Sequence, residues 1–391
     1  MEAVLIAHPA IADAAVVARS DDRWGHVPVA AIVLRVASAD PGDEALQRHC
    51  RASLAAFKVP VDFVRLASLP RTAGGKLRHA ELRERIAQGP SESPPAEAPP
   101  MERAHDRSRA IERPDGVRIS WHETGEGKLP ILLLHGTLSN GRQLTPLAAE
   151  LARAGDTRVL AVDRRGSGAS RLPDPAPIDI GVHVEDLVAV LDREAIGTVA
   201  LVGISYGAVQ ALELAARQPD RVIAVVAWEP PYGPLASLAD AARMFEIGVA
   251  TETAHRAHGP AAAAEVFLRG VAGHAAWERL SPRARAFIEG EGDGALADAA
   301  LAGLDPEGLA RIAAPVTLIT GDASEPFYAP IADALVARVP GARRIRLPGL
   351  GHAGPILDPS TVAATVREAL VQAGALSGAP ALGAHPAAAV R

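Results

Sequence analysis

Residues 203–207 read Gly203-Ile204-Ser205-Tyr206-Gly207, and this pentapeptide is the best starting point for inferring the fold. An apolar run at 199–202 precedes it, and a helix-compatible stretch at 208–214 follows it. A G-x-S-x-G sequence between a buried strand and a helix forms a tight, strained turn that exposes the serine hydroxyl. The pattern predicts that Ser205 is a nucleophile and that Gly203 and Gly207 let the helix pack closely. The alternative is an ordinary turn in which Ser205 only caps the helix.

A histidine near the C-terminus is the candidate general base. Residues 344–347 read as a short strand, and a Gly-rich loop at 348–351 leads into His352. A histidine on such a loop can reach a serine on another strand and take its proton. The chain has 13 histidines, and His352 stands out because it lies just past the last predicted strand. The alternative is a surface-loop histidine.

Two carboxylates at strand ends are candidates for the acid that holds the second ring nitrogen of His352. Glu229 ends the predicted strand 222–228, and Asp322 follows the predicted strand 316–321. Either can face the active-site end of a parallel sheet, because ligands gather at the carboxyl ends of its strands. The residues therefore leave two candidate acids.

The oxyanion hole is predicted after another buried strand. Residues 131–134 are apolar, and His135-Gly136-Thr137 follow them. The backbone N–H groups of Thr137 and of Tyr206, the residue after the nucleophile, would hold the developing negative charge. His135 braces this loop in the alternative interpretation.

Taken together, residues 113–372 resemble the α/β-hydrolase superfamily. The matching segments occur in order and at plausible spacings: His135–Thr137, Asp163–Gly168, Gly203–Gly207 and Gly351-His352. The resemblance implies an α/β fold, with a mostly parallel sheet and a helical cap, and a triad in the order serine, acid, histidine. It does not specify the substrate.

The sequence departs from the commonest family pattern at the acid. Many members place an aspartate three residues after the glycine that ends the seventh strand, and here that position holds Ser324. A second branch, which includes haloalkane dehalogenases, carries its acid directly after strand six, as Glu229 would be. We therefore rank Glu229 first and Asp322 second. A serine nucleophile argues against dehalogenase and epoxide-hydrolase chemistry and favours an acyl-enzyme intermediate.

Composition fits a two-part enzyme. The chain has 391 residues, 48% of them hydrophobic, which suggests two domains and a large core. With a net charge of −6 it shows no basic patch for nucleic acid. It has no apolar run long enough to span a membrane. A single cysteine and an N-terminus without signal-peptide features fit the cytoplasm. No metal-ligand motif or cofactor is indicated.

The chain divides at a Pro-, Ser- and Glu-rich stretch. Residues 89–112 are predicted to be an extended linker, and residues 113–375 the hydrolase domain. A helix-prone insertion at about 236–312 reads as a cap over the active site. The Ala-, Gly- and Pro-rich tail at 376–391 is predicted to be disordered.

Residues 1–88 are predicted to form a separate, small α+β domain. They resemble the C-terminal subdomain of adenylate-forming enzymes such as acyl-CoA synthetases. The carrying residues are His8-Pro9, Gly25, Lys58–Pro60, Pro70–Thr72 and Gly75-Lys76. In that family the lysine matching Lys76 contacts the carboxylate and phosphate during adenylation. Because the large AMP-binding domain expected upstream is missing, the resemblance implies ligase ancestry and not ligase activity. Lys76 is then a vestigial adenylation residue, and the alternative is an ordinary solvated lysine in a loop.

Three functional hypotheses follow. The first is a serine hydrolase of small esters or thioesters, without a cofactor. The second is part of a split or truncated acyl-CoA ligase with an appended hydrolase or thioesterase, which requires a separate AMP-binding large domain as partner. The third is a non-catalytic binding protein with the hydrolase fold, which an intact set of serine, histidine and carboxylate disfavours.

Overall fold

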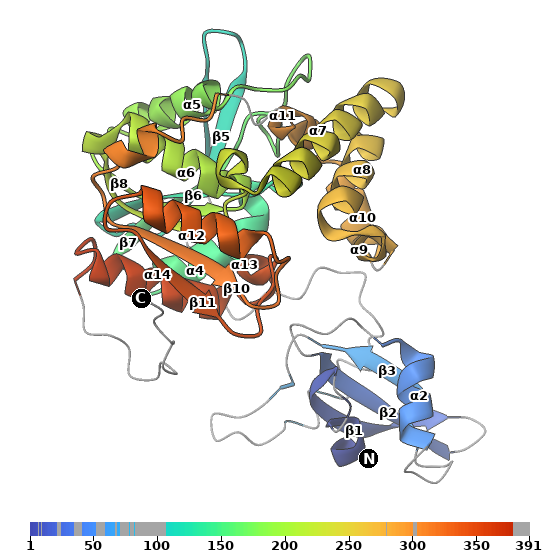
Figure 1. Cartoon of the computed structure of the whole chain (residues 1–391). Coiled ribbons are helices and arrows are strands. Elements are labelled where there is room, and N and C mark those ends of the chain that lie inside the picture. Colours follow the sequence, from blue (N-terminus) through green and yellow to red (C-terminus); the bar gives the residue numbers. More distant parts are fainter. Residues whose placement is uncertain are drawn as a thin grey trace. The chain divides into compact units, whose positions relative to one another are not determined.

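The computed structural model describes most of the chain as two compact units, Met1–Glu102 and Arg103–Arg391 (Figure 1). In the first unit it describes residues 1–6, 8, 10–21, 25–34, 41–51, 59–66, 69–70, 78 and 82. In the second it describes residues 107–278, 280–299 and 303–377. Each unit is considered by itself below.

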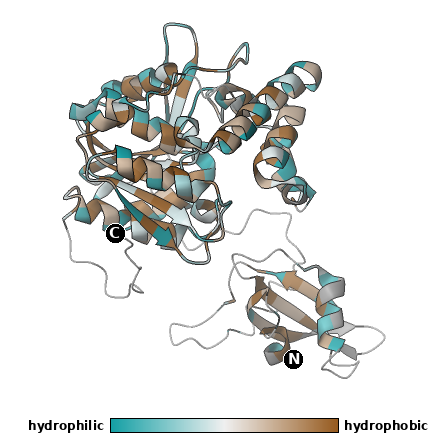
Figure 2. Cartoon of the chain, viewed as in Figure 1, coloured by the Kyte–Doolittle hydropathy of each residue, from teal (hydrophilic) through white to brown (hydrophobic). Residues whose placement is uncertain are grey.

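Within its described residues, the smaller unit contains a three-stranded mixed sheet. Strand β2 (Gly25–Leu34) pairs antiparallel with β1 (Ile11–Asp21) and parallel with β3 (Asp62–Arg65). Helices α1 (Glu2–Ile6) and α2 (Asp43–Arg51) belong to the same unit. Successive side chains of a strand point to opposite faces, and these apolar strands, brown in Figure 2, contribute to a separate core on each face. This confirms the small α+β domain, while Lys76 lies outside the described residues.

The larger unit is built on one eight-stranded sheet of order β11-β10-β9-β8-β6-β7-β5-β4. The six strands from β11 to β7 are parallel, and β5 and β4 pair antiparallel at one edge. This is the mostly parallel sheet that the resemblance implied. The strands are β4 (Arg107–Glu112), β5 (Arg118–Thr124), β6 (Leu129–Leu134), β7 (Thr157–Asp163), β8 (Val199–Ile204), β9 (Val222–Trp228), β10 (Val316–Gly321) and β11 (Arg343–Leu347).

Helices cover both faces of this sheet (Figure 1). Strand β6 shows why, because Leu132 and Leu134 join one buried core while Ile131 and Leu133 join the other. Strands that are buried on both faces read as continuous apolar runs. The first core is closed by α5 (Ile180–Arg193), α6 (Tyr206–Arg217) and α12 (Tyr328–Arg338), and the second by α4 (Thr145–Ala152) and α14 (Pro359–Gln372).

A helical insertion separates β9 from β10. It holds α7 (Leu238–His258), α8 (Pro260–Ala272), α9 (His274–Glu278), α10 (Pro282–Glu289) and α11 (Gly292–Asp298). Short helices complete the unit: η2 (Gly141–Leu144), η3 (Pro219–Arg221), η4 (Gly233–Leu235), η5 (Gly308–Arg311) and α13 (Gly354–Leu357). In the described parts of the chain, none of the helices has the length and apolarity that crossing a bilayer requires.

Two boundaries differ from the sequence-based expectation. Residues 107–112, assigned above to the linker, form β4, which pairs with β5. Arg109 on this edge strand is exposed and forms an ion pair with Glu194. The charged residues in this stretch therefore belong to a strand that faces solvent. The predicted tail begins too early, because Leu376 is buried and its N–H donates to the Leu370 carbonyl. Residues 89–106 and 378–391 lie outside the described residues.

Candidate active site

Ser205 lies at the turn between β8 and α6, in a backbone conformation that few non-glycine residues adopt. Its φ is 53° and its ψ is −122°. The backbone passes so close to both flanking glycines that no side chain fits there. A Cβ on Gly203 would lie 2.4 Å from the Gly207 carbonyl oxygen. A Cβ on Gly207 would lie 2.3 Å from the Leu134 carbonyl oxygen of the neighbouring strand. The strain of Ser205 and these two contacts are the features of a nucleophile elbow.

Glu229 and His352 are in direct contact. Glu229 is fully buried at the end of β9, and its Oε2 lies 2.7 Å from His352 Nδ1. Its other oxygen accepts a hydrogen bond from the Gly321 N–H at 2.7 Å. When a carboxylate oxygen accepts from an N–H at Nδ1 of an imidazole, Nε2 is the ring nitrogen that can take a proton. That tautomer is the one a general base needs.

Asp322 serves a different purpose. Its Oδ1 accepts a hydrogen bond from the Gly349 N–H at 2.6 Å and so braces the loop that leads to His352. The side chain is exposed, whereas Glu229 is inaccessible to solvent. The structure therefore brings Glu229, and not Asp322, to the imidazole.

The nitrogen of His352 that should face the nucleophile instead meets Tyr328, the first residue of α12. The Tyr328 hydroxyl lies 3.2 Å from Nε2, and the two rings stack with centroids 4.5 Å apart and planes 9° apart. Among the described residues, no hydrogen bond joins Ser205 to His352. Burial raises the pKa of the Tyr328 hydroxyl, and the nearby Glu229 carboxylate raises it further. A protonated Tyr328 hydroxyl can donate to Nε2 in the tautomer that carries its proton on Nδ1.

The predicted oxyanion loop passes directly over the nucleophile. A Cβ on Gly136 would lie 3.0 Å from the Ser205 Cβ, so a side chain at this crossing would crowd the nucleophile. In the described part of the chain, neither the Thr137 nor the Tyr206 backbone N–H donates to another protein group. His135 is fully buried and accepts a hydrogen bond at Nε2 from the Arg164 N–H at 3.1 Å. His135 thus braces the loop, as the alternative interpretation proposed.

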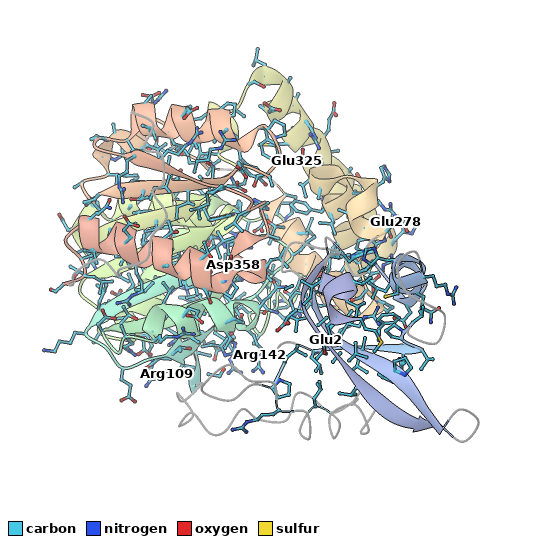
Figure 3. All side chains as sticks on the ribbon, turned by 90° about the horizontal axis from the view of Figure 1, so that it is seen from below. Glu2, Arg109, Arg142, Glu278, Glu325 and Asp358 are labelled. Atoms are coloured by element: carbon cyan, nitrogen blue, oxygen red, sulfur yellow. The ribbon has the colours of Figure 1, made fainter. Side chains whose placement is uncertain are left out.

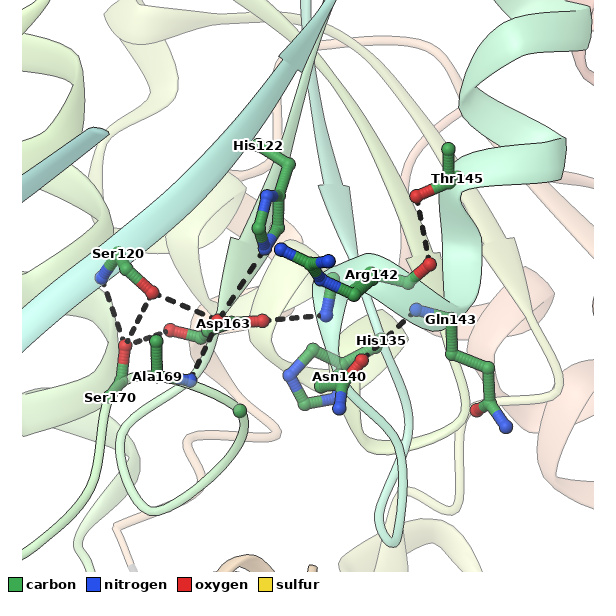
Figure 4. Close-up of polar contacts among 12 residues, drawn as sticks. Ser120, His122, His135, Asn140, Arg142, Gln143, Thr145, Asp163, Ala169 and Ser170 are labelled. Carbon is green, nitrogen blue, oxygen red and sulfur yellow. Dashed lines mark hydrogen bonds and ion pairs between the residues drawn. The ribbon is translucent and has the colours of Figure 1, made fainter. Parts of the chain in front are cut away.

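A buried carboxylate organises the loop after β7 (Figure 4). Asp163 accepts hydrogen bonds from the Gly141 N–H at 2.8 Å, the Ala169 N–H at 2.9 Å and the Ser120 hydroxyl at 2.9 Å. These bonds tie the loop to β5 and to the start of η2. They fix the position of Arg164, the next residue, whose side chain reaches the oxyanion loop.

Sequence reasoning missed three residues of this region: Tyr328, Arg164 and Asp298. Tyr328 lies in the segment after β10, a few residues beyond Glu325 in the sequence. Glu325 is labelled in Figure 3. Arg164 lies in the segment Asp163–Gly168, which supported the family resemblance but was not assigned a role in the site. Asp298 lies in the cap, where no motif marks it. Among the described residues, no group of three or more His, Cys, Asp or Glu side chains could hold a metal ion.

A sequence profile of the alpha/beta hydrolase family matches residues 131–365, which is more than half of the chain. The chain belongs to the alpha/beta hydrolase family. This confirms the fold class and places the protein among hydrolase enzymes. A second profile, of the AMP-binding enzyme C-terminal domain, matches residues 1–76 and confirms the resemblance of the first unit.

Solved structures share the fold of this alpha/beta hydrolase. A hydrolase from Pseudomonas aeruginosa PA01 is 24% identical, with a TM-score of 0.57 over 68% of this chain and 99% of that one. An enol-lactonase from Burkholderia xenovorans LB400 is 23% identical, with a TM-score of 0.55 over 67% and 100%. An esterase from Thermogutta terrifontis is 21% identical, with a TM-score of 0.56 over 68% and 99%. At this level of identity the likeness shows the fold alone.

Curated 2-succinylbenzoate–CoA ligases match the N-terminal region of the chain. The 2-succinylbenzoate–CoA ligase of Bacillus cereus (strain ATCC 10987) is 43% identical over 88 residues. The match covers 22% of this alpha/beta hydrolase chain and 18% of the ligase. The chain therefore spans less than a fifth of the length of the curated relative.

Proposed function

We propose that the chain is a serine hydrolase that cleaves a carboxylic ester or thioester through a covalent acyl-enzyme. The contact between Glu229 and His352 carries this proposal, because a fully buried carboxylate at 2.7 Å fixes the imidazole in the tautomer of a general base. The strained backbone of Ser205 supports it further. A binding protein would gain nothing from either feature.

The proposed reaction has two halves. Ser205 Oγ attacks the acyl carbonyl while His352 Nε2 takes its proton, and the N–H groups of Thr137 and Tyr206 hold the oxyanion. His352 then returns the proton to the leaving alkoxide or thiolate, which departs and leaves an acyl ester on Ser205. Water attacks this ester with His352 again as base, and the carboxylic acid is released. Glu229 stabilises the imidazolium in both halves.

The Tyr328 hydroxyl should compete with Ser205 for the Nε2 lone pair. Tyr328→Phe keeps the ring stack and removes the competing donor, whose hydrogen bond contributes about 1 kcal/mol net. We expect Ser205 to react roughly fivefold faster with a fluorophosphonate in this variant. Tyr328→Ala also removes the stack that holds the imidazole, and it should react more slowly than the wild type. A Tyr328→Phe variant that reacts more slowly than the wild type would assign the hydroxyl a catalytic role instead.

A CoA thioester is the second candidate substrate class. The observation that favours it is a match of 88 residues in the N-terminal region, which are 43% identical to part of a 2-succinylbenzoate–CoA ligase. In this reading a separate protein supplies the large AMP-binding domain, and the hydrolase releases or edits the acyl product. We also propose that the first unit and the hydrolase unit are distinct domains.

A matched substrate panel tests both candidates. We expect the full chain to hydrolyse p-nitrophenyl esters with an initial burst, since acylation and deacylation are separate steps. Intact-mass spectrometry should find the acyl group on the enzyme during turnover. A kcat/KM for an acyl-CoA thioester well above that for the ethyl ester of the same acid would favour the second candidate. A folded protein that hydrolyses none of these substrates would contradict the proposal.

A further inference from the structure

A buried ion pair links the cap to the loop of the proposed oxyanion hole. Arg164 donates from Nη1 to Asp298 Oδ1 at 2.7 Å and from Nη2 to Asp298 Oδ2 at 2.9 Å. Both side chains are almost completely buried. Arg164 follows β7, whereas Asp298 ends α11 of the cap. Two parallel hydrogen bonds of this kind fix the plane of the guanidinium as well as its position.

The same guanidinium grips the oxyanion loop through its backbone. Arg164 Nε donates to the His135 carbonyl at 2.9 Å, and Nη2 donates to the Gly136 carbonyl at 3.1 Å. The His135 ring adds a hydrogen bond from Nδ1 to the Gly136 carbonyl at 2.8 Å. Burial, with the Arg164 charge, lowers the pKa of His135 well below its usual range, so the ring is neutral. The Gly136 carbonyl therefore has two donors and a fixed direction.

The direction of that carbonyl sets the direction of the Thr137 N–H. Both groups belong to one planar trans peptide, in which C=O and N–H point in opposite directions. With the carbonyl held on Arg164, the N–H is turned away from it, at the point where Gly136 crosses Ser205. Asp298 also accepts a hydrogen bond from the Thr137 hydroxyl at 2.7 Å. The Thr137 hydroxyl is thus bonded to Asp298 directly, and the Gly136 carbonyl is linked to the same carboxylate through Arg164.

Arg164 also touches the second proposed donor residue. Its guanidinium carbon lies 5.1 Å from the ring centroid of Tyr206, within the range of a cation–π contact. We infer that Asp298 and Arg164 are positioning residues that aim the Thr137 N–H at the oxyanion, so that the cap controls the chemistry of Ser205. This inference rests on the proposed function, and it adds a dependence on α11 that the triad alone does not imply.

The test compares carbonyl with thiocarbonyl substrates in matched variants. A donor aimed at an oxygen anion favours an ester over its thionoester, and the ratio of their kcat values reports that aim. Removing an oxyanion donor costs about 10²–10³ in kcat, and a misdirected donor should cost less. We expect Asp298→Asn to lower kcat for the ester roughly tenfold or more, with little change in KM, and to lower the ester-to-thionoester ratio by a similar factor.

Two further variants separate aim from stability. Asp298→Glu keeps the charge that pairs with Arg164 but displaces the carboxylate, so it should fold and still lower the ratio. Asp186→Asn is the control, because Asp186 holds the neighbouring Arg165 in another buried pair, at 2.7 Å and 2.8 Å, and also accepts from Arg113 at 2.9 Å, without a hydrogen bond to the oxyanion loop. It should lower the melting temperature and leave the ratio unchanged.

The outcomes distinguish this inference from the proposed function. A ratio that stays at the wild-type value in folded Asp298→Asn and Asp298→Glu would overturn the positioning role of Asp298 and Arg164 (the clamp) and leave the proposal of a serine hydrolase intact. An equal fall in the Asp186→Asn control would overturn it too, since the effect would then be one of general stability. A folded wild type that reacts with neither ester nor fluorophosphonate would contradict the proposed function, and the clamp with it.

Discussion

Replacing Ser205 by Ala should lower kcat for an activated ester by a factor of about 10⁶, the cost of losing the nucleophile of a serine hydrolase. The substitution removes only a hydroxyl, and alanine has the same Cβ in the strained turn. Folding should therefore be unaffected, which a thermal melt can check. The measurement is steady-state hydrolysis of a p-nitrophenyl ester at saturating concentration. Residual activity should come from the oxyanion hole and substrate binding alone.

A second serine provides the control. Ser324 occupies the position where the commoner family pattern has its acid, and its hydroxyl has no hydrogen-bond partner among the described residues. Ser324→Ala should hydrolyse the ester at the wild-type rate. If Ser205→Ala keeps a tenth or more of the wild-type kcat, the ester is not cleaved through an acyl group on Ser205.

Glu229→Gln should lower kcat by about 10⁴, the cost of losing the group that orients the histidine in a triad. The amide keeps the size of the side chain but removes the charge that stabilises the imidazolium. Its NH₂ group can also donate to His352 Nδ1, which would favour the wrong tautomer. The Gly321 N–H can still be satisfied by the amide oxygen, so most of the local structure should persist. Kinetics and a thermal melt on the same preparation separate the two effects.

Asp322→Asn is the matched comparison for the acid. Its carboxylate braces the loop at Gly349, and an asparagine oxygen can accept the same hydrogen bond. We expect a loss of no more than a few fold in kcat. If Asp322→Asn abolishes turnover while Glu229→Gln retains it, the assignment of the acid is wrong.

The elbow could be predicted because its constraints are local. Gly203 and Gly207 flank a serine between an apolar strand and a helix, and only glycine fits where the helix start passes the neighbouring strand. The strand positions did not distinguish the two candidate acids, because each lies at the carboxyl end of its strand. The family comparison ranked Glu229 first, and only the three-dimensional structure puts it against a ring 123 residues away in sequence.

Other features could not be read from the sequence for identifiable reasons. On the edge strand β4, Arg109 is exposed and pairs with Glu194 from another part of the fold, so the strand has the composition of a charged linker. Arg164 and Asp298 are 134 residues apart, in a loop and in the cap, and no spacing rule connects them. Tyr328 begins a helix with no side-chain cap and carries no motif. Each of these depends on packing between distant segments.

Active-site labelling with a fluorophosphonate, followed by peptide mapping, tests the central claim that Ser205 is an activated nucleophile. We predict one phosphonyl group per chain, located on Ser205, with none on Ser205→Ala and strongly slowed labelling of Glu229→Gln. Labelling of a different serine, or none on a folded wild-type protein, would contradict the assignment of Ser205, His352 and Glu229 as a working triad.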